Sequence, residues 1–379
     1  MKLSHNRTII ILILSIALYF SCQTKVEYGP DIYVPDTGFK VVGYLGGGNF
    51  DEIDSIEINK LTYLNLAFGN PDKDGNLLFD GGFDVDPIVK KGHDAGLKVY
   101  ISLAGGGRPD TVIWKSVLEP EMRSKFVAKL VEYVEAHNMD GIDVDIEGNL
   151  LPYIRERYNP FVMELRQALH AKGMGMTAAL GATHIHESIN QEALEAYDFI
   201  NVMVYDKTGI WRPDNIGPHS PYSFAEDAMK FWLEEKKIPA DRITLGVPFY
   251  GFDFTPRARY IDYSEIIQGD PSLAYVDSTG MRYYNGIPII VRKVGMAKNM
   301  KLGGVMIWEI ASDTRGDLSL LKALDQAVKL GDCEAKIFFM DEDGDGFGDI
   351  TRPFTACEPP DGYVADNTDS NDTDKNVHL

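Results

Sequence analysis

Apolar and polar positions follow one another along this chain in a repeating order of strand-like and helix-like segments. Short, near-continuous apolar runs predict eight strands, over residues 40–45, 63–68, 98–103, 141–146, 174–180, 199–205, 243–249 and 303–308. Between them, apolar residues recur at the helical spacing of three or four, most clearly over 119–138 and 151–171, and also over 85–95, 224–236, 289–298 and 318–330.

Strands that are apolar on both faces and alternate with helices are typical of a parallel sheet built from β-α units. Eight such units predict an α/β fold of the (β/α)8 TIM-barrel type over residues 38–331. A doubly wound open sheet is the alternative, but it calls for a ligand signal such as a glycine fingerprint, and none follows the first strand. The stretch between Tyr250 and Gly303 is short, so no large inserted α+β subdomain is expected.

The chain places polar and aromatic residues where the apolar runs end. Glu147 follows the fourth run, Tyr205 and Asp206 follow the sixth, Tyr250 follows the seventh, and Trp308 ends the eighth. In a barrel the carboxyl ends of the strands meet on one face, which is where catalytic residues are found. The pattern therefore predicts that these side chains converge on one site.

The stretch 140–147 is the most unusual of these strand ends. Asp143, Asp145 and Glu147 alternate with aliphatic residues, so all three project from the same face of a strand. Like charges this close repel, and their burial without partners costs several kcal/mol. A calcium site and a solvated edge strand are the alternatives, but the extended chain lacks the turn geometry of a calcium loop, and the helices expected on either side would cover the strand. Catalysis is the favoured interpretation.

The composition is that of a globular protein, with 44% hydrophobic and 25% charged residues among 379. The net charge of -20 argues against nucleic acid and anionic membrane surfaces as partners. It does not identify a substrate.

The N-terminus predicts export. Basic residues precede the apolar run 8–20, as in a signal peptide over residues 1–22, and the run ends in Ser21-Cys22, which resembles a bacterial lipoprotein cleavage site. Cys22 is then expected to carry lipid on the cell envelope, with ordinary secretion as the alternative and residues 23–37 as a linker. Cys333 and Cys357 are separated by a short loop and are expected to form a disulfide in an exported protein.

The tail, residues 332–379, is strongly acidic. It has thirteen Asp or Glu against three Lys or Arg, a net charge of -10. Oxygens at calcium-loop spacing, with glycines for the turn, predict a structural Ca²⁺ held by Asp341, Asp343, Asp345 and Asp349. This segment resembles the calcium repeats of thrombospondin type 3, with a second acidic run at Asp366, Asp369, Asp372 and Asp374. A disordered acidic tail is the alternative.

The strand-end motifs together resemble those of the family 18 glycoside hydrolases, the chitinase family. The acidic signature Asp-x-x-Asp-x-Asp-x-Glu is complete from Asp140 to Glu147. Four further segments are similar to family motifs in chain order: KVYISLAGG from Lys98, MVYD from Met203, GVPFYG from Gly246 and GGVMIWE from Gly303.

The resemblance implies roles for the acidic row. Glu147 would be the general acid and then the base, in a mechanism where the 2-acetamido group of the sugar is the nucleophile. Asp145 would hydrogen-bond the acetamido N–H, and Asp143 would share a proton with Asp145. Tyr44 and Ser102 would support Asp143 by hydrogen bonds.

The resemblance also implies a sugar pocket. Tyr205 would hydrogen-bond the acetamido carbonyl, with Met203 and Asp206 lining the same pocket, and Trp308 would form the floor under the sugar. Tyr250 is assigned to either the site or the core. Ala104 departs from the family pattern, which usually has Gly there.

The implied activity is retaining hydrolysis of β-1,4-N-acetylglucosamine linkages in chitin or its oligomers, endo-acting and by a monomer. An endo-β-N-acetylglucosaminidase that cuts the chitobiose core of N-glycans is the first alternative, and a non-catalytic lectin the second. Catalysis would need no cofactor, since no spacing among His184, His186 and His219 fits zinc.

Overall fold

The computed structural model describes residues 27–107, 109–212 and 214–377. The predicted signal peptide and Cys22 lie outside the described residues, so export and lipidation stay predictions. None of the described helices is both long and apolar enough to cross a membrane.

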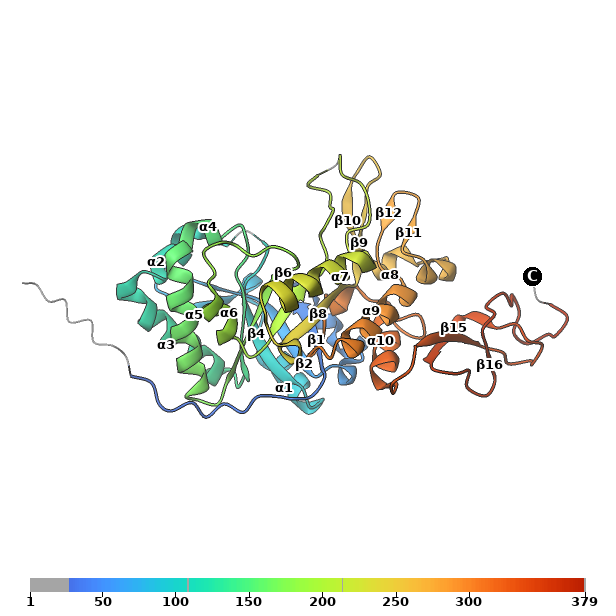
Figure 1. Ribbon diagram of the computed structural model, residues 1–379, viewed down its shortest axis with the longest axis horizontal. Coiled ribbons are helices and arrows are strands. Elements are labelled where there is room, and N and C mark those ends of the chain that lie inside the picture. Colours follow the sequence, from blue (N-terminus) through green and yellow to red (C-terminus); the bar gives the residue numbers. More distant parts are fainter. Residues whose placement is uncertain (1–26, 108, 213, 378–379) are drawn as a thin grey trace, which may run out of the picture.

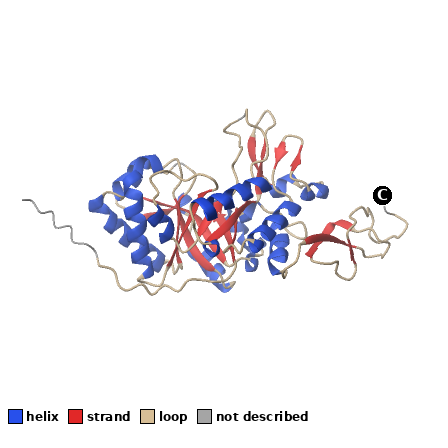
Figure 2. Ribbon diagram, in the orientation of Figure 1, coloured by secondary structure: helices blue, strands red, loops and turns tan. Residues whose placement is uncertain are grey.

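Within the described residues, eight parallel strands close into a barrel, which confirms the predicted fold (Figures 1 and 2). Neighbouring strands pair in the order β1-β13-β8-β7-β6-β5-β4-β2, and β1 pairs with β2 to close the ring. The barrel strands are β1 (Lys40–Gly46), β2 (Tyr63–Pro71), β4 (Lys98–Ala104), β5 (Gly141–Asp145), β6 (Gly175–Gly181), β7 (Ile200–Met203), β8 (Ile243–Pro248) and β13 (Gly304–Trp308). A short β3 (Leu77–Phe79) pairs antiparallel with β2 at the rim.

Helices surround the barrel and bury the apolar faces that the sequence predicts. They are α1 (Asp86–Asp94), α2 (Thr111–Val117), α3 (Pro120–Ala136), α4 (Leu151–Ile154), α5 (Tyr158–His170), α6 (Gln191–Ala196), α7 (Tyr222–Lys230), α9 (Ile287–Asn299) and α10 (Leu320–Lys329). In α3 the predicted stripe of Phe126, Leu130 and Val134 is buried against the sheet layer, as expected for a helix that covers a barrel.

The single helix predicted over 151–171 is wrong in one respect, because the chain breaks between α4 and α5. Arg155 has a left-handed φ of 23°, and residues Arg155–Arg157 form a separate short turn. Arg157 donates to Glu119 on the preceding segment. Pro160 has no N–H, and in one continuous helix its ring would clash with the carbonyl of Glu156, so α5 begins at Tyr158 with Pro160 in its first turn.

Residues 27–39, most of which were assigned to a linker, lie against α5. The Tyr28 hydroxyl donates to Glu164 at 3.1 Å, and the Ile32 N–H donates to the His170 carbonyl at 3.1 Å. The Tyr33 ring lies 4.5 Å from the His170 ring. These contacts attach the leader to the barrel before β1 begins.

A small α+β unit follows β8 beside the end of the barrel where the carboxyl ends of the strands meet. Its four strands pair antiparallel in the order β10-β9-β12-β11. They are β9 (Tyr250–Asp253), β10 (Arg259–Asp262), β11 (Ser278–Thr279) and β12 (Arg282–Tyr283), with the short helix α8 (Tyr263–Ile266) between β10 and β11. The absence of a large inserted subdomain is as expected, but the segment does form a compact wall, which projects at the top of Figure 1.

The acidic tail is folded rather than disordered along its described length. It forms a three-stranded sheet in the order β15-β14-β16, from β14 (Lys336–Met340), β15 (Asp349–Ala356) and β16 (Tyr363–Val364). A disulfide joins Cys333 to Cys357. The sheet is attached to the barrel by hydrogen bonds from Thr355 N–H to Gln326 at 2.9 Å and from the Tyr275 hydroxyl to Ile350 at 2.6 Å.

Candidate active site

Strand β5 directs the acidic row into the barrel. Parallel strands β4, β5 and β6 pair in register, with Ser102 opposite Asp143 and Asp143 opposite Thr177. Neighbouring residues at one level of a sheet project from the same face, so these three polar side chains meet inside the barrel. Asp143 is 0% exposed and Asp145 is 3% exposed.

Asp143 is held by four hydrogen bonds. Its Oδ2 accepts from Tyr44 at 2.7 Å and from Ser102 at 2.8 Å, and its Oδ1 accepts from Thr177 at 2.6 Å and from Asn201 at 3.2 Å. Burial raises the pKa of Asp143, while these four donors oppose that shift. The carboxyl group is thereby fixed at the bottom of the row.

Asp145 and Glu147 are different, because neither has such a set of donors. Burial, followed by the charges of Glu147 and Asp143, raises the pKa of Asp145 well above its usual value. Its Oδ1 is buried and has no hydrogen-bond partner in the described structure. Burial and the charge of Asp206 raise the pKa of Glu147 to about 7. Glu147 therefore titrates near neutral pH, which suits an acid catalyst.

The Gly105-Gly106 turn after β4 leaves room for the carboxyl group of Glu147. A Cβ on Gly106 would lie 2.6 Å from Glu147 Oε1, whereas a Cβ on Gly107 would meet nothing within 4 Å. Ala104, just before the turn, has a left-handed φ of 71°, a backbone conformation that favours glycine over residues with a Cβ.

An aromatic floor lies next to the row. Trp308 at the end of β13 stacks on Phe68, with ring centroids 5.5 Å apart and planes inclined by 18°. Tyr44 lies 5.7 Å from Trp308, and Met306 closes the floor from below. An indole face of this kind packs well against the apolar face of a sugar ring.

Tyr205, Asp206 and Tyr250 form one wall. Burial raises the pKa of Tyr205 well above its usual value, so its hydroxyl keeps its proton and can donate. The Tyr250 hydroxyl donates to Asp206 Oδ1. Tyr250 is 3% exposed and packs on Phe252, so it belongs to both the wall and the core.

A recess of about 150 Å³ opens behind Glu147. It is lined by apolar side chains that include Ile146, Leu151 and Ile185, and Met203 stands at its edge. His184 and His186 line the same recess, and His186 Nδ1 lies 2.7 Å from Ser188 Oγ.

Sequence reasoning missed four residues of the site: Phe68, Thr177, Asn201 and Met306. Thr177 and Asn201 are buried polar residues in otherwise apolar strands, at 0% exposure each. That contrast is the signal that could have found them, because a buried polar side chain is kept where it has a partner. Phe68 and Met306 carry no such signal, since they are ordinary core residues by type.

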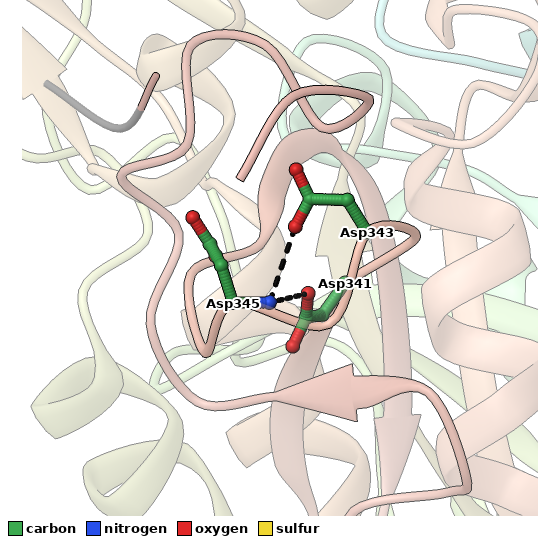
Figure 3. Close-up of side chains that lie close together, drawn as sticks. All are labelled: Asp341, Asp343 and Asp345. Carbon is green, nitrogen blue, oxygen red and sulfur yellow. Dashed lines mark hydrogen bonds between the residues drawn. The ribbon is translucent and has the colours of Figure 1, made fainter. Parts of the chain in front are cut away.

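The tail brings together only part of its predicted ligand set. Asp341, Asp343 and Asp345 gather around one turn, as Figure 3 shows, while Asp349 does not join them. Asp343 also lies with Asp369 and Asp372 from the second acidic run, with one carboxylate oxygen of each within 4.8 Å of the others.

A carboxyl group whose pKa is raised to about 7, a second carboxyl group next to it and an aromatic floor at the open end of a TIM barrel are the parts that acid-catalysed cleavage of a glycosidic bond uses. The family model for glycosyl hydrolases family 18 matches residues 40–313, and the chain belongs to this family.

Solved structures give the same result. A family 18 chitinase, ChiB, from the chitin utilization locus of Flavobacterium johnsoniae is 42% identical, with a TM-score of 0.73, over 77% of this chain and 94% of that one. A chitinase from Bacteroides thetaiotaomicron is 26% identical, with a TM-score of 0.70, over 77% and 97% of the two chains. A curated relative, a chitinase-like effector of Moniliophthora roreri, is 28% identical over 56% of this chain, and the match spans 58% of the relative's length.

Proposed function

We propose that this protein hydrolyses β-1,4-N-acetylglucosamine linkages in chitin or chitooligosaccharides, with retention and with assistance from the substrate. The observation that carries the proposal is the pairing of Glu147, whose pKa is about 7, with the buried and unpartnered Oδ1 of Asp145. A substrate with a 2-acetamido group needs a proton for the leaving glycosidic oxygen and an acceptor for the acetamido N–H. Glu147 at the groove can supply the proton, and the unpartnered oxygen of Asp145 can accept the N–H. The names of the two bacterial structural relatives, both chitinases, agree with it.

In the proposed reaction Glu147 gives its proton to the leaving glycosidic oxygen. The acetamido carbonyl oxygen attacks the anomeric carbon from the opposite face as the bond breaks, and an oxazolinium ring forms. Glu147, now a carboxylate, takes a proton from water, which opens this ring and restores the original configuration.

The other residues orient the acetamido group. Asp145 Oδ1 accepts its N–H, and the Tyr205 hydroxyl donates to its carbonyl oxygen. Trp308 supports the sugar ring from below. These contacts favour the alignment of nucleophile and anomeric carbon, which contributes to catalysis by orientation.

We propose endo-type cleavage as well. The unit from β9 to β12 is small and stands on one side of the site, which favours a groove that is open at both ends. Cleavage of the chitobiose core of N-glycans is the first alternative, because it uses the same acetamido chemistry. A lectin is the second, and the intact Glu147 argues against it.

The test is digestion of N-acetylglucosamine oligomers and a high-mannose glycoprotein side by side. The oligomers are expected to be shortened, with internal cleavage products early in the time course and the β-anomer formed first. Release of the glycan without shortening of the oligomers would replace the chitin proposal with the N-glycan one. Binding of oligomers without cleavage of either substrate would favour the lectin.

We also propose that the tail holds structural Ca²⁺. The buried Oδ2 atoms of Asp343, Asp369 and Asp372 have no hydrogen-bond partner within the described part of the chain. Asp369 is only 7% exposed and Asp372 is 9% exposed. The other oxygen of each accepts a backbone N–H, and Arg352 lies 3.7 Å from Asp372 Oδ2, so one cation faces three carboxylates. Carboxylates this close together repel, and a hard cation with oxygen ligands relieves that repulsion. The donor set therefore fits calcium.

Chelation is expected to lower the melting temperature of the protein by several degrees. A ligand present at 100 times its Kd contributes about 2.7 kcal/mol to stability. Calorimetry in Ca²⁺ and in chelator measures the difference, and Asp369→Asn should reduce it. Asp361→Asn is the matched control, because it removes the same charge from an exposed position of the tail. Identical melting curves with and without chelator would rule out a structural ion.

A further inference from the structure

His219 is a fully buried imidazole behind the wall of the active site. It is 0% exposed and lies in the loop between β7 and α7, two residues before Pro221. Its ring lies 4.9 Å from the Tyr250 ring and 5.0 Å from the Phe252 ring. Its two nitrogen atoms face two different groups, and only one of them has a hydrogen bond.

The first contact fixes where one proton is. His219 Nε2 lies 3.2 Å from the carbonyl oxygen of Tyr250. A carbonyl oxygen only accepts hydrogen bonds, so Nε2 must carry a hydrogen. In a neutral imidazole this leaves Nδ1 with a lone pair and no hydrogen.

The second contact conflicts with that neutral form. Nδ1 lies 3.6 Å from Asp206 Oδ1 and is buried without a hydrogen-bond partner. A lone pair directed at a carboxylate oxygen is repelled by it. At 3.6 Å the two atoms are too far apart for a hydrogen bond, as two mutually repelling lone pairs require. One additional proton on either atom replaces this repulsion by attraction and draws the two atoms into hydrogen-bond distance.

We propose that His219 is a positioning residue that shares one proton with Asp206 through Nδ1 and so holds Asp206 and Tyr250 in the wall of the active site. The acidic row of β5 does not perform this task, because Asp206 and His219 both lie in the loop between β7 and α7. The inference rests on the proposed hydrolytic function, since Asp206 acts on the acid Glu147.

The charged and titratable groups around the pair come from several elements. Those facing His219 are Asp206, Tyr250 on β9 and Lys293 on α9, and those facing Asp206 also include Tyr205, Tyr260 and Glu147. Burial lowers the pKa of His219, Asp206 opposes this, and Lys293 adds to it. Lys293 is itself buried, with its pKa lowered to about 7, and donates to Ser220 and Asn285.

The pair of Asp206 and His219 extends from the groove into the core. Asp206 is 45% exposed at the groove, whereas His219 is 0% exposed. When the shared proton leaves, the pair gains a negative charge. Because the charge of Asp206 raises the pKa of Glu147, loss of that proton keeps the catalytic acid protonated to higher pH.

Two substitutions test the roles of the two nitrogen atoms of His219 one at a time. The amide of His219→Asn lies near the position of Nδ1 and donates to Asp206, but it cannot exchange a proton. The amide of His219→Gln reaches the position of Nε2 and donates to the Tyr250 carbonyl. With a fluorogenic N-acetylglucosamine oligomer, His219→Asn is expected to move the alkaline limb of kcat/KM upward by about half a pH unit or more. His219→Gln is expected to lower kcat about tenfold, because Asp206 is no longer held.

The shift of the alkaline limb in His219→Asn must depend on Asp206. In the Asp206→Asn background, His219→Asn is expected to cause no further shift of the alkaline limb. A shift of the same size in that background, or wild-type kinetics of His219→Gln, would overturn the inference. If the wild-type enzyme cleaves no N-acetylglucosamine oligomer, the proposed function fails instead.

A measurement without substrate remains decisive if a histidine variant does not fold. Nitrogen-15 spectra of the imidazoles in the wild type are expected to contain one ring with Nε2–H throughout and an Nδ1 signal intermediate between its protonated and unprotonated positions. That signal should move to the unprotonated position in Asp206→Asn. A ring with hydrogen on Nδ1 and none on Nε2 would contradict the shared proton.

Discussion

Glu147→Gln is expected to reduce kcat on N-acetylglucosamine oligomers by about 10³-fold while the protein still binds them. General acid catalysis typically contributes about 10² to 10⁴ in rate, and the amide cannot donate a proton to the leaving oxygen. The glutamine side chain has the same shape as that of Glu147, so the groove and the Trp308 floor stay intact. Steady-state kinetics and calorimetric titration with an oligomer measure the two effects separately.

The matched control is Glu187→Gln, which makes the same change at an exposed position of the loop after β6. Wild-type kinetics are expected for this variant. Unchanged hydrolysis in Glu147→Gln would remove Glu147 as the acid, and loss of binding would mean that the substitution disturbed the groove.

The same acid sets the pH dependence of the wild type. The pKa of Glu147 is raised to about 7, by burial and by the charge of Asp206. Glu147 must be protonated to act, so kcat/KM is expected to fall as pH rises through about 7. The proton shared with His219 offsets the charge of Asp206 only in part, so Asp206→Asn still removes negative charge beside Glu147, lowers the pKa of Glu147 and should shift this decline to lower pH. An alkaline limit that is identical in the two proteins would contradict this assignment.

Gly106→Ala is expected to lower kcat about a hundredfold with little change in the melting temperature. The added Cβ would lie 2.6 Å from Glu147 Oε1, which is the end of a side chain that can move away. The movement relieves the contact at small cost in stability but displaces the acid, and a displacement of about 1 Å can cost about 10² in rate. Kinetics and thermal unfolding of the same preparation distinguish the two effects.

Gly107→Ala provides the comparison one residue further along. A Cβ at that position meets nothing within 4 Å, so both rate and stability should equal those of the wild type. A loss of activity in both variants would point to the flexibility of the turn, and full activity of Gly106→Ala would show that Glu147 tolerates the displacement.

The fold could be predicted because its signals are local. Each barrel strand is a short apolar run, five helical patterns lie between these runs and a sixth follows the last one, so the alternation indicated eight β-α units. The break at Arg155 has a local signal, Pro160, which the spacing of apolar residues over 151–171 does not register. The unit from β9 to β12 was underestimated for a different reason, since two-residue strands have no periodicity to detect.

The acidic row shows which site residues a sequence motif can identify and which it cannot. Period-two spacing was sufficient to place Asp143 and Asp145 on one face of β5, because side-chain direction in a strand follows from the backbone, whereas Glu147 lies two residues beyond the end of the strand. The spacing could not identify Thr177 and Asn201, which come from the two strands that follow in the ring and meet Asp143 only when the sheet closes.

What the sequence alone determined about this protein is the barrel, its strand ends and the order of the acidic row, since these depend on periodicity within single segments. Only the tertiary structure decided which groups surround them: the four donors to Asp143, the space that Gly106 leaves for Glu147, the contact of His219 with Asp206, and the meeting of Asp343 with Asp369 and Asp372. These contacts join residues distant in the chain, and burial and pairwise charge, which set the pKa of each group, exist only after the chain has folded.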